Sequence, residues 1–216
     1  MLALDHIVIS GKNAESASSN YGRKFSIKAI KGGDHANWGT YNYLAYFSNE
    51  SYIEWLGVND PEKMKTADNP LIQHLSKILE ETEQPTAFQF ALRTTEMNEY
   101  IRHFQEKDIR FYGPVPGQRQ RPDGSTLKWR MLFPLFDYQK ETLPFLIEWE
   151  TPNMISSLSN PQAITKIELS GLTKERFANI YRLKPRRIYK NYLRLQNTKI
   201  YFSDNPQQKK LSFSVE

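Results

Sequence analysis

The sequence is 216 residues long, which fits one large domain or two small ones. It contains no cysteine, and this excludes disulfide bonds, thiolate nucleophiles, zinc fingers and iron–sulfur clusters. The net charge of +5 is concentrated in residues 161–216, where 12 Lys and Arg accompany 4 Asp and Glu. A basic tail of this kind is typical of a solvated surface. Because no nucleic-acid motif accompanies it, we expect no nucleic-acid partner.

The N-terminal residues lack a basic stretch followed by a long apolar one, so we expect no signal peptide. No apolar run approaches the ~20 residues that are needed to cross a bilayer. The sequence therefore predicts a soluble cytoplasmic protein with no membrane partner.

The first part of the chain predicts a strand, a helix and three further strands. The strands are expected at residues 4–10, 25–30, 41–47 and 52–58, and the helix at residues 14–21. Asn13 stands where the helix N-cap is expected. Gly32-Gly33 is expected to turn the chain after the second strand. The order is therefore β-α-β-β-β.

The same order recurs after a helix expected at about residues 70–81. Strands are expected at residues 87–92, 109–112, 127–133 and 144–150, and a helix at residues 95–107. The segment from Gly113 to Gly117, GPVPG, is expected to break the strand before it.

A short repeat supports this pairing of units. Ile53-Glu54-Trp55 ends the first unit, and Ile147-Glu148-Trp149 ends the second at the same place in the order. This match indicates an internal repeat. After a linker that runs to Pro161, strands at residues 163–169, 192–196 and 199–203 and a helix at residues 174–181 predict a third, truncated unit.

Polar residues alternate with apolar ones in the predicted strands, and alternate residues of a strand face opposite sides. This alternation puts His6, Glu54, Gln89 and Glu148 on the concave face of a curved sheet, away from the helices. One imidazole and two carboxylates can hold a divalent cation and leave positions open for a substrate.

Pairing with arginine is the alternative for the two carboxylates, and it would lower their pKa values. Arg119, Arg121 and Arg130 are the candidates for this pairing. Arg119 and Arg121 precede a Pro-Asp-Gly turn, where they would clamp a carboxylate or phosphate or remain solvated in a hairpin loop.

His35, Thr40 and Asn42 lie in a glycine-rich segment that is expected to form a loop entering a strand. Such a loop would either line a pocket and hydrogen-bond a ligand or turn its Asn and Thr toward local backbone groups. The spacing after Gly32-Gly33 does not fit a phosphate-binding loop.

Three features together resemble the vicinal oxygen chelate superfamily: the segment LDHIVI at residues 4–9, the paired Ile-Glu-Trp strands and the doubled βαβββ order. More narrowly, residues 32–42, GGDHANWGTYN, are similar to the Gly-Gly-x-His…Gly-Thr-x-Asn stretch of the glyoxalase-like domain family. Residues 119–124, RQRPDG, followed by Trp129-Arg130, resemble that family's second-unit signature. The resemblance covers about residues 2–155.

The resemblance implies an α+β fold of paired βαβββ modules that form a cupped mixed sheet, with a partial third module. The glyoxalase-like domain would span residues 1–155, with modules at about 1–80 and 85–152, and the basic third module would span residues 161–216. The implied metal ligands are His6, Glu54, Gln89 and Glu148. Catalytic roles are implied for His6, Glu54 and Glu148, and substrate contacts for His35, Thr40, Asn42, Arg119, Arg121 and Arg130.

Members of the superfamily include lyases, dioxygenases, isomerases and fosfomycin-modifying transferases, and some members bind drugs without metal or catalysis. Two hypotheses follow for this chain. In the first, a divalent metal (Zn, Ni, Mn or Fe) acts as Lewis acid on a small polar metabolite. In the second, the protein sequesters an aromatic or anionic small molecule without metal. Pairing of modules between two chains would give a homodimer.

Overall fold

The computed structural model describes residues 1–120, 124, 126–150, 159–184, 191–203 and 209–216. The chain divides into two compact units. We call residues 6–90 and 154–163 the N-terminal unit, and residues 1–5, 91–153 and 164–216 the C-terminal unit. No helix in the described part of the chain is long and apolar enough to cross a membrane.

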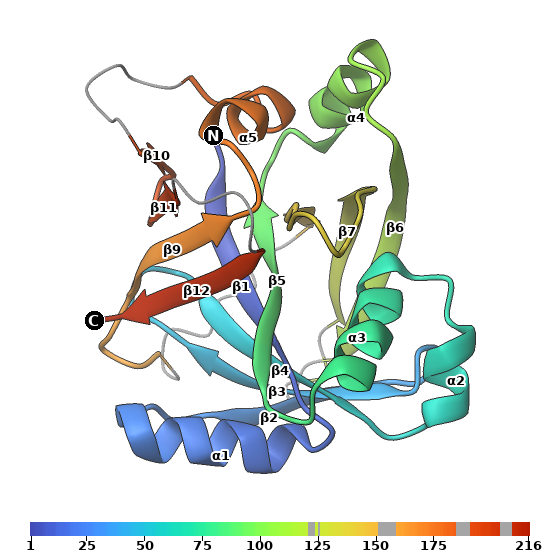
Figure 1. Ribbon diagram of the computed structural model, residues 1–216. Coiled ribbons are helices and arrows are strands. Elements are labelled where there is room, and N and C mark those ends of the chain that lie inside the picture. The colour runs from blue at the N-terminus through green and yellow to red at the C-terminus, as the bar shows by residue number, and fades with distance from the viewer. Residues whose placement is uncertain (121–123, 125, 151–158, 185–190, 204–208) are drawn as a thin grey trace. The chain divides into compact units, whose positions relative to one another are not determined.

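The first βαβββ module, blue to cyan in Figure 1, contains one helix and four strands. These are β1 (Ala3–Ser10), α1 (Ala14–Phe25), β2 (Ile30–His35), β3 (Thr40–Tyr46) and β4 (Tyr52–Val58). The strands are hydrogen-bonded in the order β2-β3-β4-β1. The pair of β1 and β4 is parallel, and the other pairs are antiparallel.

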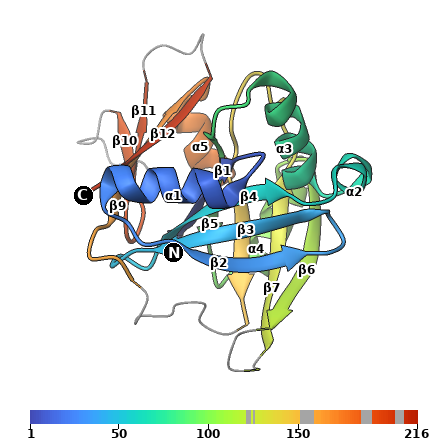
Figure 2. The ribbon, with the colours of Figure 1, turned by 90° about the horizontal axis from the view of Figure 1, so that it is seen from below.

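Helix α1 lies against one face of this module, where it contacts β3 and β4 (Figure 2). It begins after Asn13, whose side chain accepts a hydrogen bond from the backbone N–H of Ser16, as the N-cap prediction requires. Gly57 permits the close approach, because a Cβ there would lie 2.9 Å from the Cβ of Ala14. The backbone N–H of Ala14 donates to the Tyr41 hydroxyl at 3.1 Å. Tyr41 and Gly57 therefore mark the helix side of the sheet.

The second module, green to yellow in Figure 1, follows the helices α2 (Pro61–Thr66) and α3 (Pro70–Glu81). It contains β5 (Thr86–Arg93), α4 (Met97–Glu106), β6 (Phe111–Gln120), β7 (Thr126–Pro134) and β8 (Phe145–Trp149). Its strand order is β5-β8-β7-β6, with β5 parallel to β8. These connections are the same as in the first module.

The third module consists of β9 (Ile164–Ser170), α5 (Lys174–Ile180), β10 (Tyr192–Arg194), β11 (Lys199–Phe202) and β12 (Lys210–Val215). The strand β9 is parallel to β11, and β10 is antiparallel to β11, as β1, β4 and β3 are related in the first module. Within the described residues no strand corresponds to β2. Instead, β12 pairs with the other edge of β9.

The α+β class, the doubled βαβββ order and the partial third module are confirmed. The strand expected at residues 25–30 is wrong, because α1 continues to Phe25 and β2 begins at Ile30. Gly32-Gly33 and the segment from Gly113 to Gly117 lie inside β2 and β6 rather than ending strands. Both strands absorb the irregular residues as shifts of register, between Lys31 and Asp34 and between Tyr112 and Val115.

Candidate functional site

Three polar side chains gather on the face of the first module opposite α1: His6 on β1, Asn42 on β3 and Glu54 on β4. The strand register brings them to one face. His6 pairs with Tyr52 across β1 and β4, and Leu44 pairs with Glu54 across β3 and β4. Because residues two apart in a strand share a face, Asn42 lies on the same side as Glu54. We call these three residues the polar cluster.

The carboxylate of Glu54 contacts both other members of the polar cluster. Its Oε1 accepts a hydrogen bond from Nδ2 of Asn42 at 2.5 Å. Its Oε2 lies 3.4 Å from Nε2 of His6. The ring of His6 stacks on Tyr52, with centroids 4.5 Å apart and planes 22° apart. The stacked ring and the carboxylate together set the orientation of the imidazole.

The amide of Asn42 is oriented from β2. Its Oδ1 accepts a hydrogen bond from the backbone N–H of Gly33 at 2.8 Å. The amide NH₂ therefore points to Glu54, which as a carboxylate only accepts. Gly32 leaves room for this amide, since a Cβ there would lie 2.1 Å from Oδ1 of Asn42. The glycine pair thus serves the polar cluster, and not the turn that the sequence predicted.

His35 and Thr40 extend the network of Asn42. The Nδ1 atom of His35 lies 3.0 Å from Oγ1 of Thr40, and its Nε2 lies 3.5 Å from Nδ2 of Asn42. Because an amide NH₂ is a donor, the Nε2 facing it is the acceptor, and Nδ1 carries the hydrogen toward Thr40. The loop that enters β3 is shorter than expected, since β2 ends at His35 and β3 begins at Thr40. Gly39, with φ of +64°, forms the turn between them.

The polar cluster is buried: His6 is 3% exposed, Asn42 6% and Glu54 8%. Its neighbours on the same face include the buried side chains of Val8 and Leu56. Burying a carboxylate costs several kcal/mol unless it is paired, and apolar residues of similar volume often stabilise a protein as well or better. Such departures from an apolar interior are typical of functional sites.

Gln89 is also buried in the N-terminal unit, at 4% exposure. Its Oε1 accepts a hydrogen bond from the backbone N–H of Phe90, in its own strand, at 2.9 Å. One lone pair of the side-chain oxygen is thus engaged by the backbone.

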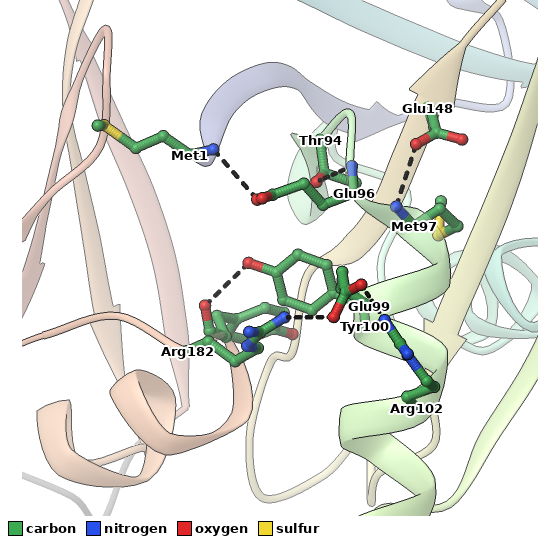
Figure 3. Close-up of polar contacts among 10 residues, drawn as sticks. Met1, Thr94, Glu96, Met97, Glu99, Tyr100, Arg102, Glu148 and Arg182 are labelled. Carbon is green, nitrogen blue, oxygen red and sulfur yellow. Dashed lines mark hydrogen bonds and ion pairs between the residues drawn. The ribbon is translucent and has the colours of Figure 1, made fainter.

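Glu148 has different partners, all in the C-terminal unit. It lies opposite Arg130 across β8 and β7. The Nε and Nη2 atoms of Arg130 lie 2.7 Å and 2.6 Å from Oε2 of Glu148. The Oε1 atom accepts a hydrogen bond from the backbone N–H of Met97 at 3.0 Å (Figure 3). Arginine is therefore the charged partner of this carboxylate.

Met97 is the first residue of α4, and the N-cap residue Glu96 makes no capping hydrogen bond with its side chain. Figure 3 shows Glu148 reaching from its strand to this end of the helix. The carboxylate accepts a hydrogen bond from a first-turn N–H and places negative charge at the helix N-terminus, as a capping side chain does. Glu148 thus helps to hold α4 in place.

Asp5 belongs to the C-terminal unit and is a buried carboxylate that the sequence reasoning missed, at 1% exposure. It accepts a hydrogen bond from Nε1 of Trp149 at 2.8 Å, and Nη1 of Arg93 lies 3.9 Å away. The presence of an acidic residue inside an apolar strand is the sequence feature that could have indicated Asp5. Tyr52 was missed as well, although its alternation with Glu54 placed it on the site face. No feature of the sequence indicated that the backbone N–H of Met97 contacts Glu148.

The remaining predicted arginines are only partly described. Arg119 pairs with Leu127 through the backbone of β6 and β7, while its side chain is outside what the structure describes. Arg121 lies outside the described residues.

The predicted metal ligands divide between the two units, with Glu148 in the C-terminal unit and the other three in the N-terminal unit. In the described ranges, no three His, Asp or Glu side chains come together as metal ligands would. His6 and Glu54 have suitable spacing, since 3.4 Å matches the edge of a tetrahedron with metal–ligand bonds of ~2.1 Å. A protein site for such a metal commonly supplies three or more ligands. His6 and Glu54 would supply two of these ligands.

The fold occurs in proteins of known structure. A hypothetical protein from Staphylococcus aureus is similar over 97% of this chain and 88% of its own, with a TM-score of 0.77 and 22% identity. Methylmalonyl-CoA epimerase from Mycobacterium tuberculosis is similar over 67% of this chain and 86% of its own, with a TM-score of 0.50 and 16% identity. Likeness at these identities shows the fold alone.

No curated protein sequence matches the chain. The family model described as a glyoxalase-like domain matches residues 4–184, which is most of the sequence. The match includes the polar cluster, the glycine pair beside it and both βαβββ modules. The chain therefore belongs to the glyoxalase-like domain family of the vicinal oxygen chelate superfamily.

Proposed function

We propose that the polar cluster binds a small polar metabolite and moves a proton on it. The observation that carries the proposal is the buried carboxylate of Glu54, held between an amide and an imidazole. The family assignment supports a small-molecule site on this fold. The roles predicted for Glu148, Arg119, Arg121 and Arg130 remain predictions.

Each member of the polar cluster has a role in this proposal. Asn42 engages Oε1 of Glu54, so Oε2 is the oxygen that meets an acidic C–H, hydroxyl or amide of the ligand. Imidazoles take up and release protons near neutral pH. A proton abstracted by Oε2 can therefore pass to Nε2 of His6 and return to the ligand. Tyr52 stacks on His6 and holds it in position for this transfer.

Inversion of a carbon centre that carries an acidic hydrogen requires removal of the proton from one face and return of a proton to the other face, and in this proposal Oε2 of Glu54 and Nε2 of His6 are the two groups that share these steps. The reaction class of an epimerase is thus compatible with the polar cluster. This compatibility makes acids and thioesters with an exchangeable α-hydrogen the first compounds to test, methylmalonyl-CoA among them.

The test begins with a thermal-shift screen of hydroxy acids, keto acids and thioesters on the wild-type protein. Compounds that raise the melting temperature are then titrated against Glu54→Gln, which keeps the shape of the side chain. Glu83→Gln is the matched control, because Glu83 is exposed and pairs with Lys12 at the surface. We expect at least about tenfold weaker binding in Glu54→Gln, since a hydrogen bond to a charged group contributes about 1.5–3 kcal/mol.

Incubation of the bound compound in deuterated water then separates catalysis from sequestration. Deuterium uptake that depends on Glu54 indicates proton transfer, and tight binding without uptake favours the sequestering function. A ligand that binds wild type and Glu54→Gln equally would contradict the proposed site.

Metal use is tested separately by elemental mass spectrometry on protein without a histidine tag. Near-stoichiometric metal that is lost in Glu54→Gln would mean that other groups complete the coordination beside His6 and Glu54. In that case the metal would act as Lewis acid beside His6 and Glu54.

A further inference from the structure

A cavity in the C-terminal unit has a composition unlike that of the polar cluster. Its volume is about 780 Å³, within the usual range for ligand sites. It is lined by α5, by His103 of α4 and by the residues that follow both helices. The cationic lining residues are Lys107, Arg176, Arg182 and Lys184, and no acidic residue is among the described lining. Ile109, Ile180 and Leu183 supply apolar surface.

The cations of this cavity differ in how far they are neutralised. Arg176 is engaged, because its Nε and Nη2 atoms lie 2.8 Å and 2.7 Å from the carboxylate of Glu141. For Arg182, the carboxylate of Glu99 is 3.9 Å from Nη1. Within the described residues no carboxylate forms an ion pair with Lys107 or Lys184. Positive charge therefore remains available in the cavity.

Hydrogen bonds connect α4 and the end of α5, the two parts of the chain that line the cavity. Nε2 of His103 lies 3.0 Å from the backbone oxygen of Asn179. The hydroxyl of Tyr100 donates to the backbone oxygen of Tyr181 at 3.0 Å (Figure 3). These bonds hold α4 against the end of α5. The cavity is thus part of the folded unit.

Arg182 has an unusual backbone conformation for its residue type, with φ of +53°. The backbone N–H of Leu183 donates to the oxygen of Ala178 at 2.9 Å, which closes the end of α5. Glycine ordinarily occupies the left-handed position in such a helix end, since a side chain there is strained. An arginine at a strained backbone position motivates a functional hypothesis for it.

We propose that this cavity binds a small organic anion, a phosphate or carboxylate that carries an apolar body. The cations would contact the anionic group, and the three apolar side chains would cover the body. The site is independent of the polar cluster, which belongs to the other unit. The alternative is that Lys107 and Arg182 only complement the negative C-terminal ends of two helices.

Isothermal titration calorimetry of the full chain tests the proposal with phenyl phosphate, inorganic phosphate and phenol. We expect phenyl phosphate to bind more tightly than either fragment, and its affinity to fall as salt rises. Lys107→Gln should raise the Kd for phenyl phosphate about tenfold or more, as for loss of a charge-assisted contact. Lys140→Gln is the control, because Lys140 lies in the same unit and outside the cavity. The Kd of this variant for phenyl phosphate should match that of wild type.

Arg182→Gly distinguishes ligand binding from a structural role. Glycine relieves the strained backbone, so the melting temperature should stay equal or rise while the Kd for phenyl phosphate increases. A lower melting temperature with unchanged Kd would support the helix-end alternative. Absence of phenyl phosphate binding to wild type, or equal Kd values for wild type and Lys107→Gln, would overturn the proposal.

Discussion

Asn42 occupies the space that a side chain on Gly32 would need. A Cβ on Gly32 would lie 2.1 Å from Oδ1 of Asn42 and 3.0 Å from Cδ1 of Leu44. The neighbouring Gly33 contributes its backbone N–H to the same oxygen. One glycine thus makes room for the amide and the other holds it toward Glu54.

Gly32→Ala should therefore push the Asn42 amide away from Glu54 and lower the free energy of unfolding by about 1–3 kcal/mol, as overpacking does. Gly33→Ala is the matched control. It keeps the N–H, and a Cβ there has no atom within 4 Å, so the change should stay within about 0.5 kcal/mol. Urea unfolding measures both. Equal losses in the two variants would show that the amide is not held in this way.

Glu148 should contribute to stability mainly through the hydrogen bond that it accepts from the backbone N–H of Met97. Glu148→Ala removes the acceptor at the start of α4, and we expect a loss of about 1–3 kcal/mol in the free energy of unfolding. Glu148→Gln keeps an oxygen for that N–H and loses the ion pair with Arg130, whose side chain is 36% exposed. Because partly exposed ion pairs contribute little, this variant should lose about 1 kcal/mol or less.

Hydrogen exchange of the Met97 amide checks the mechanism of this effect. Its protection should fall in Glu148→Ala and persist in Glu148→Gln. Unchanged protection in Glu148→Ala would mean that the helix end is satisfied by another group.

The buried carboxylate of Asp5 should make Trp149 sensitive to substitution. Trp149→Phe removes the indole N–H that donates to Asp5 at 2.8 Å and should cost about 2–4 kcal/mol, because it combines lost packing with the loss of a hydrogen bond to a buried charged group. Trp129→Phe is the control, since the two rings contact each other with centroids 5.1 Å apart. Similar losses in thermal unfolding for the two variants would contradict a special role of the Asp5 bond.

The order of helices and strands could be predicted because it depends on local periodicity. The helix expected at residues 70–81 is found there as α3, with Asn69 as its N-cap and Pro70 in its first turn. The turns predicted at Gly32-Gly33 and at Gly113 were wrong, because these turn-forming residues lie inside strands. There, pairing with β3 and β7 outweighs the local preference.

The candidate site was predictable in part for the same reason. Alternation within single strands was enough to place His6 and Glu54 on one face. The contact between Asn42 and Glu54 was not predictable, because it depends on the register of β3 against β4.

The Ile-Glu-Trp repeat does not determine which partners its two glutamates have. Leu44 lies opposite Glu54, whereas Arg130 lies opposite Glu148. Identical residues at equivalent strands therefore have different partners, because the neighbouring strand supplies them. The repeat indicated the fold correctly, but it could not assign equal roles to the two carboxylates.

Tyr100 predicts how stability depends on pH in the alkaline range. Burial raises the pKa of Tyr100 to about 12, and its hydroxyl donates to the backbone oxygen of Tyr181. The ordinary pKa of tyrosine is about 10, so between about pH 10 and about pH 12 the unfolded chain releases this proton and the folded chain retains it. The unfolded state then binds fewer protons, and the free energy of unfolding falls as pH rises, by up to about 1.4 kcal/mol per pH unit.

Tyr100→Phe should be less stable than wild type by about 1 kcal/mol at pH 8, through the lost hydrogen bond. Urea unfolding from pH 8 to pH 11.5 should show this difference shrinking or reversing, because phenylalanine has no proton to lose. A constant difference across that range would mean that Tyr100 ionises equally in the folded and unfolded chains.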